Sequence, residues 1–162
     1  MKKLIIGLML LCSLLFPACS TAKYSDAVDC NTIANALTKD FLADKEYSSY
    51  KAEEIELMLD GISDFEDYAL LYSKSADDIG EIGIFKAKDE SSAKTGLDNI
   101  KKYLATTTED KKAFIENYLP DEISKIDGGE VRRFGKYVVL ILESNDKKIQ
   151  LFDEVDKILR EE

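Results

Sequence analysis

Histidine is absent from the 162-residue sequence, and its absence removes several common kinds of active site. Without an imidazole there is no Ser-His or Cys-His nucleophile pair, no His-ligated zinc and no general base of the usual kind near neutral pH. Tryptophan is absent as well, so a sugar ring has no indole on which to stack. Any catalysis would therefore have to depend on acidic side chains.

Basic residues are too few to balance the acidic ones. The chain has 22 Lys and Arg against 32 Asp and Glu, which gives a formal net charge of −10 at pH 7. Such a surface repels both nucleic acid and anionic lipid headgroups. We therefore exclude nucleic acid as a partner and expect the surface to favour a cationic one.

The sequence also lacks an apolar run that is long enough to span a bilayer. Its longest apolar run lies at the N-terminus. Lys2 and Lys3 form a short positive region, and residues 4–16 follow without a charge. Even when it is extended to Cys19, the run has sixteen residues, whereas a spanning helix needs roughly 20. We interpret residues 1–18 as a signal peptide, which predicts export from the cytoplasm.

The end of this segment resembles a bacterial lipobox, in which apolar residues and a small residue precede a Cys that is acylated before cleavage. Residues 15–19 read Leu-Phe-Pro-Ala-Cys. A diacyl group on Cys19 would carry the two chains that stable anchoring needs, so we predict an extracytoplasmic protein held at the cell membrane. The alternative is ordinary cleavage after Ala22, since residues 20–22 read Ser-Thr-Ala and fit a small-x-small pattern.

Removal of the signal peptide would leave 144 residues with a net charge of −12. We assign residues 19–28 to the lipidated cysteine and a polar tether, and residues 29–162 to a single domain that is large enough for a real core. When fully stretched, a tether of ten residues reaches about 33–36 Å. The domain would therefore stay close to its own membrane.

Cysteine chemistry is limited to one position in the exported chain. Of the three cysteines, Cys12 leaves with the signal peptide and Cys19 is acylated, so Cys30 is the remaining thiol. A lone thiol makes neither an intramolecular disulfide nor a cysteine-rich metal site. No basic neighbour would lower the pKa of Cys30. We expect a small buried hydrophobe at a helix start, and a redox-active or intermolecular thiol is the alternative.

Apolar spacing and capping residues predict five helices. They are one capped by Asp29 or Asn31 that runs to Phe41, one at residues 52–60, one capped by Asp89 or Ser91 that runs through Leu104, one at residues 109–118, and one capped by Asn145 or Asp146 that runs through Leu159.

Strand-forming residues predict two hairpins. Residues 68–73 and 82–88 form the first, and residues 131–134 and 137–143 form the second. Residues 137–142 are apolar at both alternating sets of positions, which is typical of a strand covered on both faces. The sequence therefore predicts an α+β domain, in which two antiparallel hairpins form a four-stranded sheet with helices packed on it, and Val139 and Leu140 are buried towards opposite faces.

Several matches to catalytic motifs are attributed to chance. Residues 48–51 and 91–94 fit the Ser-x-x-Lys pattern of penicillin-binding enzymes, and residues 94–96 fit their Lys-Thr-Gly pattern. In those enzymes the two motifs come from separate elements and converge in space. Here they overlap on one expected helix, and the Ser-Asp-Asn motif is missing.

Paired carboxylates occur at residues 77–78, 121–122 and 153–154. Glycosidases need two carboxylates at a set separation in a cleft built for sugar, and neighbours in sequence do not establish such a pair. No stretch fits the calcium-binding loop with ligands at alternate positions. We interpret these residues as a solvated acidic surface, and we expect no metal ion and no cofactor.

Several segments together resemble a bacterial lipoprotein family known as domain of unknown function 4358. The likeness extends over roughly residues 29–159, and its most specific parts are Phe-Lys-Ala-Lys-Asp at 85–89 and Tyr-Leu-Pro at 118–120. The family implies an envelope lipoprotein and implies no activity. The matching segments are the lipid-anchored start and residues 67–73, 76–89, 118–122 and 135–138.

We therefore expect a noncatalytic binding or scaffold module at the outer face of the membrane. Its partners would be the membrane, through the lipid on Cys19, and an envelope protein or wall material. The alternative is an envelope hydrolase that works through carboxylates. The only site residue that the sequence identifies is Cys19, as the point of lipid attachment.

Overall fold

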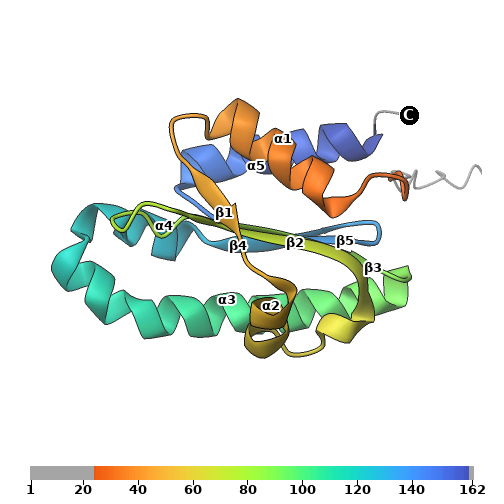
Figure 1. Cartoon of the computed structure of the whole chain (residues 1–162), viewed down its shortest axis with the longest axis horizontal. Coiled ribbons are helices and arrows are strands. Elements are labelled where there is room, and N and C mark those ends of the chain that lie inside the picture. The colour runs from red at the N-terminus through yellow and green to blue at the C-terminus, as the bar shows by residue number, and fades with distance from the viewer. Residues whose placement is uncertain (1–23, 161–162) are drawn as a thin grey trace, which may run out of the picture.

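The computed structural model describes residues 24–160, which form one sheet with helices on both of its faces (Figure 1). The strands are β1 (Tyr47–Ser49), β2 (Phe65–Ser73), β3 (Glu81–Ala87), β4 (Glu130–Phe134) and β5 (Tyr137–Leu142). The helices are α1 (Cys30–Phe41), α2 (Ala52–Met58), α3 (Glu90–Tyr118), α4 (Ile123–Gly128) and α5 (Asn145–Arg160), with 3-10 turns η1 (Ile62–Asp64) and η2 (Pro120–Glu122). The predicted α+β class is confirmed.

The sheet has five strands in the order β1-β2-β3-β5-β4, and all neighbouring strands are antiparallel. Both predicted hairpins are present, as β2–β3 and β4–β5, but the predicted number of four strands was wrong. The additional strand is β1, which pairs Tyr47 with Ser73 and Ser49 with Leu71. Three residues are too few to form an alternating pattern, so this edge strand could not be predicted from the spacing of apolar residues.

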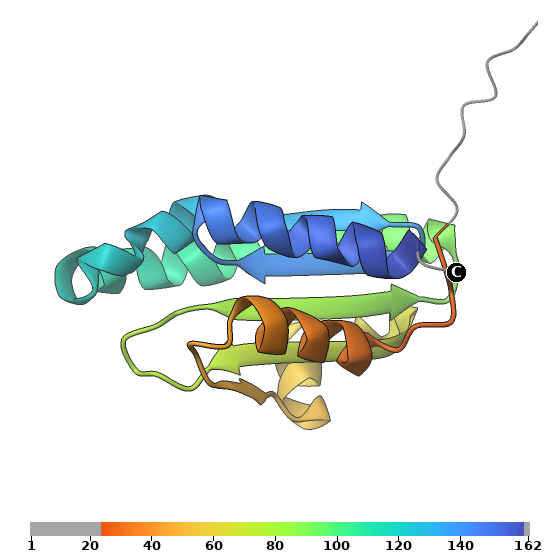
Figure 2. The same cartoon turned by 90° about the horizontal axis from the view of Figure 1, so that it is seen from above.

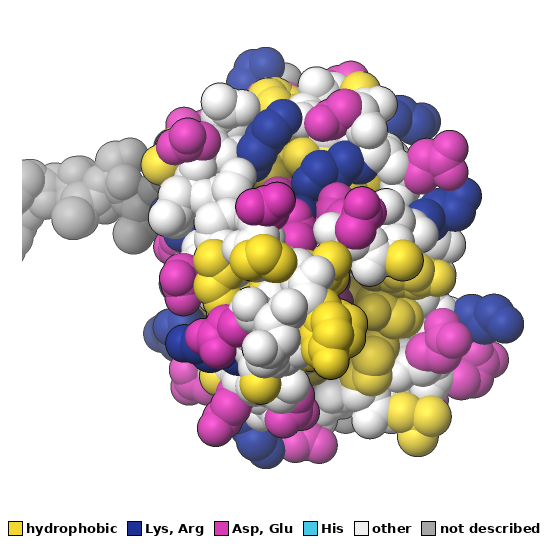
Figure 3. Space-filling view, turned by 90° about the vertical axis from the view of Figure 1, so that its left-hand side faces the viewer, with side chains coloured by type: hydrophobic (Ala, Val, Ile, Leu, Met, Phe, Trp, Pro, Cys, Tyr) yellow, Lys and Arg dark blue, Asp and Glu magenta, His cyan; other side chains and the backbone are white. Residues whose placement is uncertain are grey.

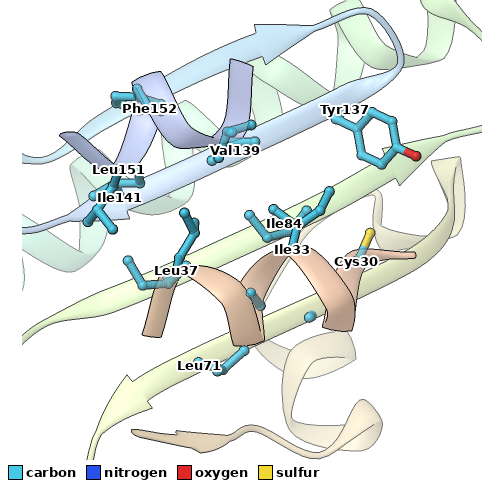
Figure 4. Close-up of a cluster of buried hydrophobic side chains, with 14 of the residues drawn as sticks. Cys30, Ile33, Leu37, Leu71, Ile84, Tyr137, Val139, Ile141, Leu151 and Phe152 are labelled. Carbon is cyan, nitrogen blue, oxygen red and sulfur yellow. The ribbon is translucent and has the colours of Figure 1, made fainter. Parts of the chain in front are cut away.

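The two faces of the sheet carry separate hydrophobic clusters. Helices α1 and α5 lie side by side over one face, and α2 and α3 lie over the other (Figures 1 and 2). Val139 packs in the cluster beneath α1 and α5, where Ile33 and Phe152 also lie (Figure 4). Leu140 packs in the cluster beneath α3. Both β5 side chains are 0% exposed, which confirms that this strand is covered on both faces.

Helix α3 is continuous where the sequence predicted two helices with a break between residues 104 and 109. It has 29 residues, so at about 1.5 Å per residue it is roughly 44 Å long. The threonines at 106–108 lower helix propensity, but the Thr108 hydroxyl donates to the Leu104 carbonyl oxygen at 2.9 Å and so finds its partner within the helix. No Gly or Pro interrupts the helix between Gly96 and Pro120. Another short helix, α4, precedes β4 and was not among the five predicted helices.

Residues 24–28, which the sequence assigned to the tether, pack against the domain. The Tyr24 ring meets Phe134 edge-on at 5.7 Å, and its hydroxyl donates to Asp156 at 2.8 Å. The Val28 carbonyl accepts a hydrogen bond from the Tyr137 hydroxyl at 2.6 Å. Cys19 and the predicted signal peptide lie outside the described residues. Within residues 24–160, no helix combines the length and the apolar character that crossing a membrane requires.

The described chain begins and ends at the same end of the molecule (Figure 1). The loop between β2 and β3, helix α4 and the C-terminal end of α3 lie at the other end. A long α3 therefore extends from the end near the chain start to the end farthest from it.

Candidate functional site

A groove lies over the sheet face that carries α2 and α3. Its volume is about 510 Å³. The space-filling view from the end that carries the β2–β3 loop shows a hollow with hydrophobic side chains (Figure 3). Helix α3 forms one wall, and the segment from Tyr50 to Asp60 forms the other. The lining side chains are aromatic, apolar, hydroxyl-bearing and charged: Tyr50, Met58, Asp60, Asn99, Lys102, Tyr103, Thr106, Thr107 and Lys111.

A smaller recess of about 140 Å³ adjoins the groove and shares Tyr50 and Lys111 with it. The recess lies between the β2–β3 loop and α3. Tyr72, near the end of β2, contributes a ring whose centroid is 4.5 Å from that of Tyr50. Tyr50 is held in place because its N–H donates to the Leu70 carbonyl at 2.9 Å, which continues the pairing of β1 with β2.

Glu81 is the buried charged residue of the recess. It is the first residue of β3 and is 2% exposed. Its carboxylate accepts a hydrogen bond from the Tyr103 hydroxyl at 2.9 Å. Burial raises the pKa of Glu81, and the Tyr103 hydrogen bond and the charge of Lys111 only partly oppose that shift. Within the described chain, no Lys or Arg nitrogen lies within 4.0 Å of this carboxylate.

The tyrosines around Glu81 are held in their protonated form. Burial and the nearby charge of Glu81 raise the pKa of Tyr50 to about 12. The same two causes raise the pKa of Tyr103. These hydroxyls therefore serve as hydrogen-bond donors at neutral pH, and none of them is a phenolate base.

An ion-pair network holds the β2–β3 loop beside this recess. Asp78 of the loop binds Lys125 of α4 at 2.5 Å and Lys45 at 3.1 Å. Lys45 also binds Glu143 at 2.7 Å, and Lys125 also binds Glu122 at 2.5 Å. Every charge of this network has an opposite partner, as buried charges require. The network therefore fixes the loop that leads into Glu81.

The paired carboxylates of the sequence separate into structural roles. Asp78 and Glu122, each from a different pair, both bind Lys125 in the network just described. The Glu122 carboxylate also accepts from the Ile79 N–H at 3.0 Å. Asp77 is exposed, and its carboxylate accepts from the Ser75 hydroxyl within the loop. Among residues 24–160, no three His, Cys, Asp or Glu side chains are grouped in a way that could hold a metal ion.

The remaining motif residues lie away from the groove floor or are buried. Residues 91–96, with both the Ser-x-x-Lys and the Lys-Thr-Gly matches, lie on the first turns of α3, as the sequence predicted. Cys30 is 0% exposed, which confirms the expected small buried residue. Burial and the charge of Asp67 raise the pKa of the Cys30 thiol, so the thiolate is disfavoured. The predicted lipid site, Cys19, lies outside the described residues.

Comparison with known families agrees with the resemblance read from the sequence. The profile described as "Domain of unknown function (DUF4358)" matches residues 61–143. The chain belongs to the DUF4358 family. The match includes Tyr72, Glu81 and Tyr103, whereas Tyr50 precedes it. Its extent is narrower than the likeness from residue 29 to 159. No curated protein and no solved structure matches the chain.

Sequence reasoning missed the groove of this DUF4358 domain and its buried carboxylate. Glu81 stands at the start of an apolar strand and follows Gly80 in a polar turn, which is typical of an exposed position. A signal was present in the resemblance, because residues 76–89 contain Glu81 and are one of its segments. Only the packing of α3 against β3 buries this side chain beside the tyrosines.

Proposed function

We propose that this protein is a cell-envelope lipoprotein, anchored through Cys19, whose domain binds a partner in the α2–α3 groove and does not convert it. The observation that carries the binding proposal is the groove of about 510 Å³, in which two tyrosines and a methionine lie beside hydroxyl, amide and charged side chains. Concave sites of this composition are the usual places where proteins bind small molecules and peptide segments.

The arrangement of the molecule supports a site that faces away from the membrane. Tyr24 is fixed to the domain at the end where the chain starts, and the recess beside the β2–β3 loop lies towards the opposite end. The five residue spacings from Cys19 to Tyr24 reach about 17–18 Å when fully stretched. A domain held so closely at one end would present its other end to an envelope protein or to wall material.

The noncatalytic reading rests on the chemistry of the described residues. The Cys30 thiol is buried with a raised pKa, and the raised pKa values of Tyr50 and Tyr103 keep their hydroxyls protonated. The carboxylates around Lys45 and Lys125 are paired with cations. These groups lack an activated nucleophile with a base beside it.

The alternative is a hydrolase that works through carboxylates, and one observation favours it. Glu81 is a carboxyl group with a raised pKa beside a groove, which is a property of general acids. Such an enzyme would need a second carboxylate across its substrate. Glu81→Gln is the variant that separates the two readings, because it would abolish turnover by a hydrolase.

The test uses the full-length protein in its own cells, with chemical cross-linking followed by isolation of the cross-linked species. Thr107→Trp places a large ring in the groove, and we expect it to remove most of the cross-linked partner. Ala105→Trp is the matched control, since Ala105 is exposed on the same helix and does not line the groove. Equal cross-linking by both variants would contradict binding in the groove.

Product formation is followed in parallel, with purified protein and envelope fractions. We expect retention of envelope material without a product. A reproducible product that Glu81→Gln abolishes, in a variant that still folds, would replace the binding proposal by the hydrolase.

A further inference from the structure

Two opposite charges line the inner recess without forming an ion pair. Both Glu81, which is buried, and Lys111 of α3, which is half-buried, line the recess. Within residues 24–160, the Lys111 ammonium makes no hydrogen bond or ion pair, although its charge acts on Glu81. The neighbouring Asp78 and Lys125, in contrast, are joined at 2.5 Å. The recess is therefore lined by a buried carboxylate and by a cation that acts on its charge without being joined to it.

The cost of this arrangement points to a ligand. A buried carboxylate is destabilising unless it is paired and hydrogen-bonded, and Glu81 has a hydrogen bond from Tyr103 but no ion pair. A ligand with a cationic group near Glu81 and an anionic group near Lys111 would give each of these two charges an ion-pair partner. The rings of Tyr50 and Tyr72 beside the recess would favour the cationic part, since ammonium groups are attracted to aromatic faces.

The size of the recess limits the ligand to a small unit. At about 30 Å³ per water molecule in the liquid, a volume of about 140 Å³ corresponds to four or five waters, which is comparable to a small amino acid. The adjoining groove, with Asn99, Thr106 and Thr107, offers space and hydrogen-bonding groups for anything attached to that unit.

We propose that the recess binds an α-amino-acid zwitterion, with its ammonium group at Glu81 and its carboxylate at Lys111. The ligand is either a free amino acid or an end of a larger chain that keeps both groups on one carbon. This inference rests on the proposed binding function and names the ligand class of the same site.

The test measures binding of alanine to the full-length protein in detergent by calorimetry. We expect alanine to bind saturably. N-acetylalanine, which lacks the ammonium, and alaninamide, which lacks the carboxylate, should each bind at least 10-fold more weakly than alanine. Glu81→Gln removes the preference for alanine over N-acetylalanine, and Lys111→Met removes the preference over alaninamide. Lys112→Met is the control, because Lys112 is the next residue of α3 and is exposed outside the recess.

The two sources are distinguished with γ-glutamylglycine, which keeps a free ammonium and carboxylate on one carbon of a longer molecule. Binding tighter than that of alanine supports the end of a larger chain, and weaker binding supports a free amino acid. The zwitterion proposal is overturned if the parent binds neither alanine nor γ-glutamylglycine saturably. It is also overturned if alanine and N-acetylalanine bind equally well. If the Thr107→Trp cross-linking result still holds, the ligand class alone is wrong; if it fails too, the binding function is wrong.

Discussion

At the residue scale, the two glutamates that are buried within residues 24–160 differ in one respect that decides their effect on stability. Glu143 is 1% exposed and binds Lys45 at 2.7 Å, whereas Glu81 is 2% exposed and accepts only the Tyr103 hydroxyl among the described residues. Removing a carboxylate from water is costly, and of these two only Glu143 has an ion pair that offsets the cost. Glu81 therefore lowers the stability of the folded domain, and residues with this effect are common at binding sites.

Glu81→Gln should make the free domain more stable at pH 7. Because burial raises the folded pKa above the reference value of 4.5, unfolding releases a proton, and stability falls as pH rises from about 4.5 to the folded pKa. Glutamine keeps an acceptor for Tyr103 and has no charge to bury. Thermal unfolding at pH 4 and pH 7 checks this: the stability of the variant relative to the parent should be greater at pH 7 than at pH 4.

The matched control is Glu143→Gln, which should lower stability at pH 7 because it removes the partner of Lys45. The same sign of change for both variants would show that the environments of the two carboxylates do not differ in the way described.

Asp78→Asn should lower stability and remove an acid-sensitive step. Burial opposes ionisation of Asp78, but hydrogen bonds from Lys125 and the Gly80 N–H outweigh it and lower its pKa to about 2. A folded pKa below the reference of 3.8 gives stability that is present above that value and lost as pH falls through about 2. With 1.36 kcal/mol per pKa unit, the loss at pH 7 is about 2 kcal/mol. Urea unfolding at pH 7, 4 and 2 measures it, and a variant whose stability falls as steeply as the parent's below pH 4 would contradict the assignment.

At the element scale, β5 is the strand that joins the two hydrophobic clusters. Leu140→Ala should cost about 2–5 kcal/mol, since it removes buried contacts and leaves a cavity beneath α3. The control is Ile149→Ala on α5, whose side chain is 51% exposed, so that a change of less than about 0.5 kcal/mol is expected. Urea unfolding measures both, and a cost of less than about 1 kcal/mol for Leu140→Ala would mean that β5 is not central.

Helix α3 can lie as close to β2 as it does because residue 96 is glycine. A Cβ atom at this position would come within 3.0 Å of the Phe65 ring, which is itself buried against Phe85. Alanine is favoured over glycine in a helix interior by about 1 kcal/mol, whereas overpacking of a core costs about 1–3 kcal/mol.

We therefore expect Gly96→Ala to destabilise the domain in urea unfolding, despite its higher helix propensity. The companion variant combines Gly96→Ala with Phe65→Leu, which shortens the obstructing side chain. The double variant should be destabilised by less than the sum of the two single changes. A more stable Gly96→Ala variant would show that α3 has room to move. This glycine, which completes the chance Lys-Thr-Gly match, thus has a packing role.

At the scale of the whole molecule, the predicted anchor is tested by Cys19→Ala. Without the thiol no diacyl group can be attached, so the variant should accumulate as precursor or appear in the medium, while the parent partitions into detergent. Fractionation of cells followed by phase separation measures this. A Cys19→Ala variant that remains in the detergent phase like the parent would contradict lipid attachment at this residue.

The fold class, the two hairpins and the double-sided burial of β5 followed from the sequence alone. Each depends on the period of apolar residues within a short stretch, which reports directly whether a strand or helix has one covered face or two. The resemblance to the DUF4358 family also followed from local segments. The absence of histidine is a property of composition, and no folding could change the chemistry that it excludes.

The edge strand β1, the continuity of α3, the groove and the burial of Glu81 were decided by tertiary structure. Tyr50 follows β1, Glu81 begins β3 and Tyr103 lies in α3. Each of these residues, taken alone, has the sequence context of an ordinary surface residue. They meet because the strand order places β1 and β2 beside β3, and because α3 crosses that face closely at Gly96. Local periodicity carries no information about such contacts, since they depend on which faces pack together.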